Sequence, residues 1–291
     1  DQSNPVVLDK IEFPEPAITF AVEPKSKGDE EKISNGLQKL QDEDPTFKVT
    51  LNTETHQTLI SGVGDQHLDV IVSKLKSKFN VSVNLVDPKV PYRETIKKKV
   101  KVEGKHKKQS GGHGQYGHVW IEFEPGDQED LIFEEKIFGG AVPKQYFPAV
   151  EKGLRESILR GVLAGYPVVN LKATLVDGSY HPVDSSEMAF KLAAHLAYKK
   201  GLPQASPVLL EPILHVEVYV PDSYMGDIIG DLNKRRGRIL GMNPQDGGIQ
   251  QVVAEVPQAE MFKYAIDLRS MTQGRGYFKA WFERYEEVHP M

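Results

Sequence analysis

A glycine-rich stretch at residues 109–125, QSGGHGQYGHVWIEFEP, comes nearest to a known chemical motif. Gly112, Gly114 and Gly117 match G-x-G-x-x-G, the pattern that lets a backbone approach a pyrophosphate at a helix N-terminus. That use requires a buried apolar strand before the glycines and a helix after them. Here the polar EGKHKKQS precedes them and the alternating HVWIEFEP follows. We therefore predict a loop joining two strands, and keep a nucleotide-dependent enzyme as the alternative of another class.

Histidines near this loop could in principle hold a metal. His106, His113 and His118 are spaced irregularly, without the His-Glu-x-x-His pattern that places two ligands on one helix face. The chain contains no cysteine, which excludes thiolate ligands and disulfides. We predict no metal site, and a metal-dependent enzyme belongs with the same alternative.

A fourth histidine, His181, lies between Ser179 and Asp184 in DGSYHPVDSSE. A catalytic triad would also need a nucleophile elbow and an oxyanion hole, and neither is present in the sequence. The P-loop pattern G-x-x-x-x-G-K-[ST] does not occur in the 291 residues. We predict no catalytic residue and no cofactor in this chain.

Two basic runs stand out against a net charge of −5. The first consists of Lys97, Lys98, Lys99, Lys101, Lys105, Lys107 and Lys108. The second, NKRRGR, contains Lys234, Arg235, Arg236 and Arg238. Such runs contact RNA phosphates or keep an exposed edge soluble, and the residues themselves leave both readings open. Beside the first run, Tyr116 could stack on a base.

The positioning elements begin with a repeated order. EPAITFAVEP (15–24) and EPILHVEVYVP (211–221) each place Glu-Pro before a strand-like run. A helix follows each strand, at about 28–42 and 224–235, and then two strands, a second helix and a last strand. In the second copy the second helix is expected over 258–271. Both copies therefore predict the βαββαβ order of ferredoxin-like domains.

The middle, about 90–208, follows a different pattern. It opens with one basic strand, RETIKKKVKVEGKHKK, and continues through the glycine-rich loop. An amphipathic helix is expected from Lys144 to Leu163, with Pro148 in its first turn. A last helix is expected with Asp184 as its N-cap and Glu187 completing a capping box.

Composition is that of a folded protein, with 39% hydrophobic and 26% charged residues. No apolar run approaches the roughly 20 residues that span a bilayer, so we predict no membrane partner. The polar start of the chain leads us to expect a fragment of a longer protein.

Several long motifs resemble bacterial elongation factor G. They are FPEPAITFAVEPKSK, DPTFKVTLNTETHQTLISGVGDQHLDVIV, QSGGHGQYGHV, GGAVPKQYFPAVEKG, GVLAGYPVVNLKATLVDGSYHPVDSSEMAFK, PVLLEPI, MGDIIGDLNKRRG and AEMFKYAIDLRSMTQGRGY. The resemblance covers about residues 9–288 and corresponds to domains three, four and five. It implies an α+β fold with ferredoxin-like domains at 1–88 and 209–291, flanking a ribosomal-protein-S5-like arm at 89–208.

The resemblance also implies a function and a site. The parent would be a GTPase that promotes tRNA–mRNA translocation, with GTP and Mg bound in a domain outside this chain. The tip of the arm, which enters the decoding region, would comprise Gln109, Ser110, Gly111, Gly112, His113, Gly114, Gln115, Tyr116, Gly178, Ser179, Tyr180, His181 and Pro182. Contacts to ribosomal RNA would come from Lys105, Lys107, Lys108, Lys234, Arg235, Arg236 and Arg238.

The resemblance implies two partners: the ribosome, through its 16S and 23S rRNA and its proteins, and the tRNA–mRNA pair. It also implies a cytoplasmic monomer. Four features depart from the family pattern: His113 in place of arginine, Pro182 in place of an acidic residue, Trp120, and the HKK of 106–108. They support the alternative of a paralogue specialised for ribosome recycling or ribosome protection.

Overall fold

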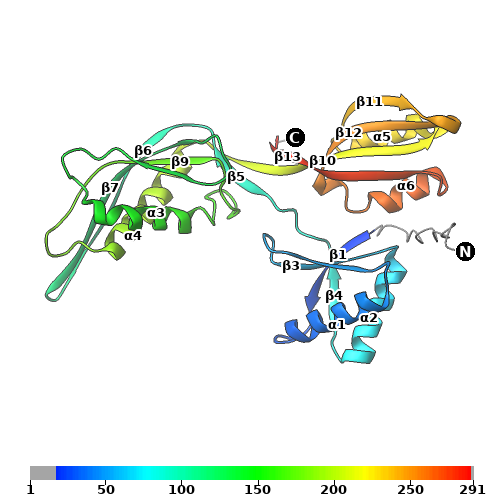
Figure 1. The fold of residues 1–291 in the computed structure, drawn as a ribbon, viewed down its shortest axis with the longest axis horizontal. Helices are drawn as coiled ribbons and strands as arrows, with labels where there is room; N and C mark the ends of the chain where they lie inside the picture. The colour runs from blue at the N-terminus through cyan, green and yellow to red at the C-terminus, as the bar shows by residue number, and fades with distance from the viewer. Residues whose placement is uncertain (1–17, 290–291) are drawn as a thin grey trace, which may run out of the picture. The chain divides into compact units, whose positions relative to one another are not determined.

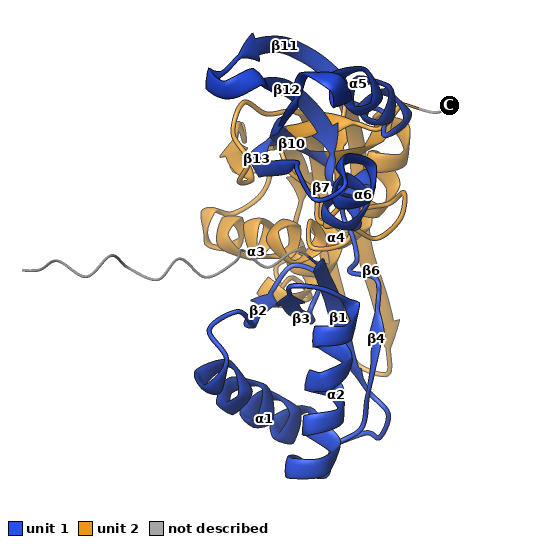
Figure 2. Ribbon diagram, turned by 90° about the vertical axis from the view of Figure 1, so that its right-hand side faces the viewer, with its two compact units in different colours: residues 1–90, 212–284 blue, residues 91–211, 285–291 orange. Residues whose placement is uncertain are grey.

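A computed structural model of the chain describes residues 18–289, which form three β-sheets and six α-helices. The fold is α+β, as predicted (Figure 1). Contacts divide it into two compact units, one running to Val90 and including Pro212–Arg284, the other comprising Pro91–Glu211 and the residues from Tyr285 on (Figure 2). No helix within residues 18–289 is both long and apolar enough to cross a membrane.

The first sheet has the predicted βαββαβ element order. Its elements are β1 (Ile18–Pro24), α1 (Glu30–Glu43), β2 (Lys48–Asn52), β3 (Gln57–Gly62), α2 (Asp65–Phe79) and β4 (Val83–Val86). The strands lie in the order β2-β3-β1-β4, and all three pairings are antiparallel. The apolar positions of the two helices pack on the sheet as a buried core that includes Ile33, Leu37, Leu40, Leu68, Ile71 and Leu75.

The C-terminal sheet repeats this element order. Its elements are β10 (Pro207–Pro221), α5 (Met225–Lys234), β11 (Arg238–Pro244), β12 (Ile249–Pro257), α6 (Tyr264–Thr272) and β13 (Tyr277–Glu287), with strands in the order β11-β12-β10-β13. The helix predicted over 258–271 is shorter than expected. Residues 258–264 make i→i+3 hydrogen bonds, from Met261 N–H to Gln258 O and from Tyr264 N–H to Met261 O, so α6 begins only at Tyr264.

The middle of the chain has its own sheet and two helices. Its elements are β5 (Arg93–Ile96), β6 (Val100–Ser110), β7 (His113–Pro125), β8 (Ile132–Glu135), α3 (Phe147–Ser157), β9 (Leu171–Ser179) and α4 (Glu187–Gly201). The sheet order is β6-β7-β9-β8, in which β8 runs parallel to β9. Strand β5 instead pairs with the first residues of β10. The predicted single basic strand is therefore two strands that belong to different sheets.

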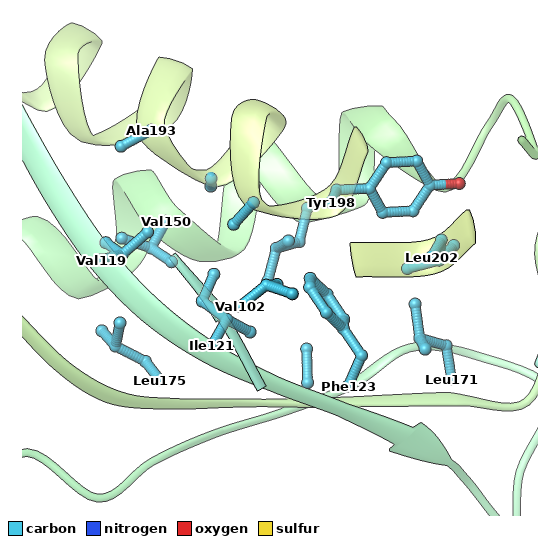
Figure 3. Close-up of a cluster of buried hydrophobic side chains, with 14 of the residues drawn as sticks. Val102, Val119, Ile121, Phe123, Val150, Leu171, Leu175, Ala193, Tyr198 and Leu202 are labelled. Atoms are coloured by element: carbon cyan, nitrogen blue, oxygen red, sulfur yellow. The ribbon is translucent and has the colours of Figure 1, made fainter. Parts of the chain in front are cut away.

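Helices α3 and α4 cover one face of this sheet. Val102, Val119, Ile121 and Phe123 point from β6 and β7 toward Ala193 and its neighbours on α4 (Figure 3). Because strand side chains alternate, the intervening residues of β6 and β7 point to the opposite, open face. The core thus decides which side chains of the hairpin remain exposed.

Two helix boundaries predicted here are wrong. The helix expected to reach Leu163 ends at Ser157, because the buried carboxylate of Glu94 accepts backbone hydrogen bonds from Leu163, Ala164 and Tyr166 at 2.7–3.0 Å and holds them in a loop. The N-cap of α4 is Ser186, whose Oγ accepts a hydrogen bond from Ala189 N–H. Asp184 lies two residues before that cap and pairs with the hairpin described below.

Candidate nucleic-acid interface

The glycine-rich stretch is a β-hairpin with a two-residue turn. Strand β6 continues to Ser110, β7 begins at His113, and these two residues pair across the turn. Gly111 and Gly112 reverse the chain with φ values of 57° and 118°, which glycine adopts without strain. The loop predicted for Gln109–Tyr116 is therefore wrong in extent, because two glycines suffice to connect the strands.

The remaining glycines of the pattern allow close packing. A Cβ on Gly117 would lie 2.3 Å from the carbonyl oxygen of Ala189 on α4, and one on Gly114 would lie 2.7 Å from Asp184 Oδ2. A Cβ on Gly104, across the hairpin, would lie 2.1 Å from the carbonyl oxygen of Ala193. The glycines therefore serve a tight turn and a strand–helix contact. A strand follows them, so the helix that a dinucleotide fingerprint requires is not there.

The second predicted tip segment also begins within a strand. Gly178 and Ser179 are the last residues of β9, and only the chain from Tyr180 to the start of α4 forms a loop. The last residue of β9, Ser179, pairs with His118 of β7. The hairpin end of β7, at His113, lies five residues farther out. At about 3.4 Å per residue the hairpin extends about 17 Å beyond the end of β9. Figure 1 shows it projecting from the sheet.

Backbone contacts join the two predicted segments at Tyr116. Its N–H donates to the carbonyl of Asp184 at 2.9 Å, and its carbonyl accepts from Ser185 Oγ at 2.8 Å. The rings of Tyr116 and His181 have centroids 6.4 Å apart. The structure therefore brings together the glycine-rich hairpin and the loop that carries His181.

His181 is held in one orientation by its own loop. Its Nδ1 accepts hydrogen bonds from the backbone N–H groups of Val183, at 3.2 Å, and Asp184, at 2.9 Å. Its backbone N–H donates to Ser185 Oγ at 2.9 Å. A nitrogen that accepts two hydrogen bonds carries no proton, so the ring proton is on Nε2. The side chain is 49% exposed and presents a hydrogen-bond donor at a fixed position.

Tyr116 is more engaged with the protein than its predicted stacking role requires. Its hydroxyl lies 2.5 Å from Ser179 Oγ, which also lies 2.7 Å from His118 Nδ1. His118 Nε2 is 3.1 Å from a carboxylate oxygen of Glu103. This half-buried network supports the base of the hairpin and keeps the Tyr116 ring beside His181.

The outer part of the hairpin is exposed. Gln109, Ser110, Gly111, Gly112, His113 and Gln115 are all exposed, as are Lys105, Lys107 and Lys108 on β6 and Tyr180, His181 and Pro182 in the loop. Gln115 Oε1 lies 2.8 Å from His106 Nε2 across the two strands. These polar and cationic groups face solvent rather than the core.

The second basic run is folded into ion pairs. Arg235 is only 14% exposed and contacts Asp231 at 2.8 Å and Asp267 at 2.5 Å. It also donates to the carbonyl of Glu260 and lies over the ring of Tyr264. Burial alone would lower the pKa of Arg235, but the hydrogen bonds to the two aspartates outweigh it and raise that pKa. Arg235 therefore stabilises its own domain.

Its neighbours in the run are all exposed. Arg236 contacts Glu260 at 3.3 Å, and Arg238, whose side chain is 65% exposed, contacts Glu255 at 3.0 Å. The i,i+4 spacing of Asp231 and Arg235 was the sequence signal for this network. The sequence analysis did not select Ser185, which bridges the two tip segments, because no sequence pattern marks it.

No group of three or more His, Asp or Glu side chains that could hold a metal ion occurs among residues 18–289. The candidate site is a surface made of a fixed histidine, a cationic hairpin and exposed backbone at a glycine turn. Such a surface suits phosphates and hydrogen-bonding edges of a nucleic acid.

Comparison with known proteins assigns the chain to a family. Residues 13–87 match the family model of elongation factor G domain III, residues 88–206 match domain IV, and residues 208–291 match the elongation factor G C-terminus. A crystal structure of a protein from Thermus thermophilus is similar to this chain, with a TM-score of 0.82 and 46% sequence identity. The match covers 96% of this chain and 42% of that protein. The chain therefore belongs to the elongation factor G family of translation factors, of which it contains domains III and IV and the C-terminal domain.

Proposed function

We propose that this chain is the ribosome-binding part of a GTPase that promotes tRNA–mRNA translocation. The tip formed by the β6–β7 hairpin and the His181 loop enters the decoding region and blocks return of the tRNA. GTP and Mg are bound by a part of the parent protein that lies outside this chain. The parent acts as a cytoplasmic monomer. Its three modules 1–88, 89–208 and 209–291 each make a separate contact with the ribosome.

The preformed geometry of His181 carries this proposal. Two backbone donors occupy Nδ1, so the exposed Nε2–H is ready to donate to an RNA oxygen without any rearrangement of the loop. Donors held in place before binding lose little entropy when the partner arrives. The exposed lysines of β6 supply the cationic surroundings that a phosphate backbone requires.

The test is single-turnover translocation by the full-length parent with His181→Ala. We expect slower tRNA–mRNA movement with little change in the thermal midpoint, because the exposed ring bonds only to backbone N–H groups of its own loop. His195→Gln is the matched control, since His195 is partly exposed on α4 and outside the tip. Translocation at the unmodified rate in His181→Ala would contradict the proposed role.

One observation favours a second function, in ribosome recycling or protection. His113 is exposed beside the hairpin turn, where the family pattern has arginine. Histidine carries less positive charge than arginine near neutral pH, which weakens attraction to the mRNA and tRNA backbones. Subunit splitting and translocation, measured side by side with the same parent protein, separate the two functions.

A further inference from the structure

Trp120 lies on the open face of the arm, outside the tip. Because Val119 and Ile121 point into the core, Trp120 points to the face that α3 and α4 do not cover. It is half-buried, and Lys101 Nζ lies 5.8 Å from its ring centroid. Neither the tip nor the core explains a large aromatic side chain at this position.

The same face carries cations toward the tip. Lys101, Lys105 and Lys107 occupy alternate positions of β6, and all three are exposed. Lys105 Nζ lies 5.7 Å from the Tyr116 ring, which repeats the arrangement at Trp120. Trp120 and Tyr116 are four residues apart on β7, a separation of about 13 Å. The face therefore presents two aromatic rings, each accompanied by a lysine.

Two carboxylates flank Trp120, Glu103 on β6 and the exposed Asp177 on β9, but among residues 18–289 none forms an ion pair with Lys101, Lys105 or Lys107. Glu103 is the acidic residue among these positions of β6, and it is engaged by His118 Nε2 at 3.1 Å. At the other end of the face, Lys99 contacts Glu122 and Glu124, and Lys172 contacts Glu124 and Glu134, all within 3.8 Å. Lys101, Lys105 and Lys107 are outside these ion pairs, and they follow β6 from the level of Glu122 toward the hairpin turn.

We infer that this surface, defined by Lys101, Trp120, Lys105 and Lys107, binds single-stranded RNA by stacking a base on Trp120. Cationic grooves with interleaved aromatic rings bind single strands in this way, because every base has a flat face and every nucleotide a phosphate. The bases of a duplex are stacked on one another and cannot reach a ring on a flat sheet. The contact between Lys101 and Trp120 is weak at an exposed site, so the ammonium can move to a phosphate when a base stacks. The inference rests on the proposed function and extends the RNA contact from the tip along the arm.

The chain offers a direct probe, because it contains only two tryptophans. In the Trp281→Phe variant of this chain, Trp120 is the sole tryptophan and its fluorescence reports stacking. Titration with an octauridylate at low salt is expected to quench that fluorescence in a saturable manner, and added salt to reverse it. Binding without quenching, or no binding, would overturn the inference. An equal response to poly-glutamate would also overturn it, since a protein partner or simple charge attraction would then account for the surface.

Substitutions separate stacking from charge. Trp120→Ala is expected to weaken octauridylate binding about fivefold or more, measured by anisotropy, and Trp120→Phe to weaken it less. Lys101→Gln is expected to lower the salt dependence by about one phosphate contact. Lys99→Gln is the matched control, because Lys99 lies two residues from Lys101 and is paired with Glu122 and Glu124. Equal effects of the two lysine changes would contradict the assignment.

The outcome is distinguishable from failure of the proposed function. If His181→Ala slows translocation but Trp120 fluorescence does not respond to RNA, the extended surface is wrong and the proposed function stands. If Trp120 responds while His181→Ala translocates at the normal rate, the RNA surface stands and the tip mechanism is wrong.

Discussion

Lysines at the end of the first basic run and Arg235 in the second have opposite structural roles. Lys105, Lys107 and Lys108 project from a strand into solvent, whereas Arg235 is held by Asp231 and Asp267 and stacked on Tyr264. The difference follows from where the carboxylates lie. Asp231 is one helical turn before Arg235, while the residues facing Lys107 and Lys108 across the hairpin are Tyr116 and Gln115. A buried and paired cation such as Arg235 is not available to a nucleic acid, whereas the exposed lysines of β6 are.

The largest effect is expected from breaking the folded run. Arg235→Ala leaves two aspartates and the Glu260 carbonyl without their donor. Because Asp267 is half-exposed, we expect a loss of about 2–3 kcal/mol in the free energy of unfolding, less than for a fully buried pair. Urea unfolding measures it. Lys234→Ala, one residue away and exposed, should change stability by less than about 0.5 kcal/mol. Similar losses in both variants would show that Arg235 stabilises its domain no more than its exposed neighbour does.

A smaller effect sharpens the same comparison through pH. Hydrogen bonds from Arg284, followed by the charges of Arg284 and Arg238, hold the pKa of Glu255 below its usual value of 4.5. Stability from this group is therefore present above pH 4.5 and is lost as pH falls through the lowered pKa. Glu255→Gln should have a shallower loss of stability on acidification, by about 0.5–1 kcal/mol. Urea midpoints between pH 6 and pH 3 provide the measurement. An unchanged pH profile would show that the arginines do not depend on this carboxylate.

The smallest effect on stability is expected from the exposed run. Lys105→Gln, Lys107→Gln and Lys108→Gln should each change the free energy of unfolding by less than about 0.5 kcal/mol. Each should nevertheless reduce the salt dependence of ribosome binding by about one contact, because a phosphate partner is lost. Binding of the parent to ribosomes at several salt concentrations tests this. Arg238→Gln, in a pair with Glu255, is the control from the other run.

Prediction from sequence succeeded where a local pattern determines a local structure. The alternation in EPILHVEVYVP predicted the strand that became β10, and the repeated βαββαβ order is present in both flanking sheets. It failed where a distant residue decides. Glu94 ends the helix expected to reach Leu163, although about 70 residues separate them, and no local signal marks that contact.

The candidate site was likewise predicted only in part. Resemblance identified the hairpin and the His181 loop as one tip, and the structure brings them together through Tyr116, Asp184 and Ser185. Composition alone grouped Arg235 with the surface cations, because charge in a sequence does not reveal burial.

The sequence by itself determined the family, the α+β class, the repeated element order and the strand–turn–strand nature of the glycine-rich stretch. These depend on residue types, spacing and the left-handed backbone values that glycine tolerates. Only the tertiary structure decided which cations are exposed, which nitrogen of His181 carries the proton, and that Trp120 shares a face with Lys101. Those properties arise when α4 covers one side of the hairpin, since strand alternation then commits the other side to solvent.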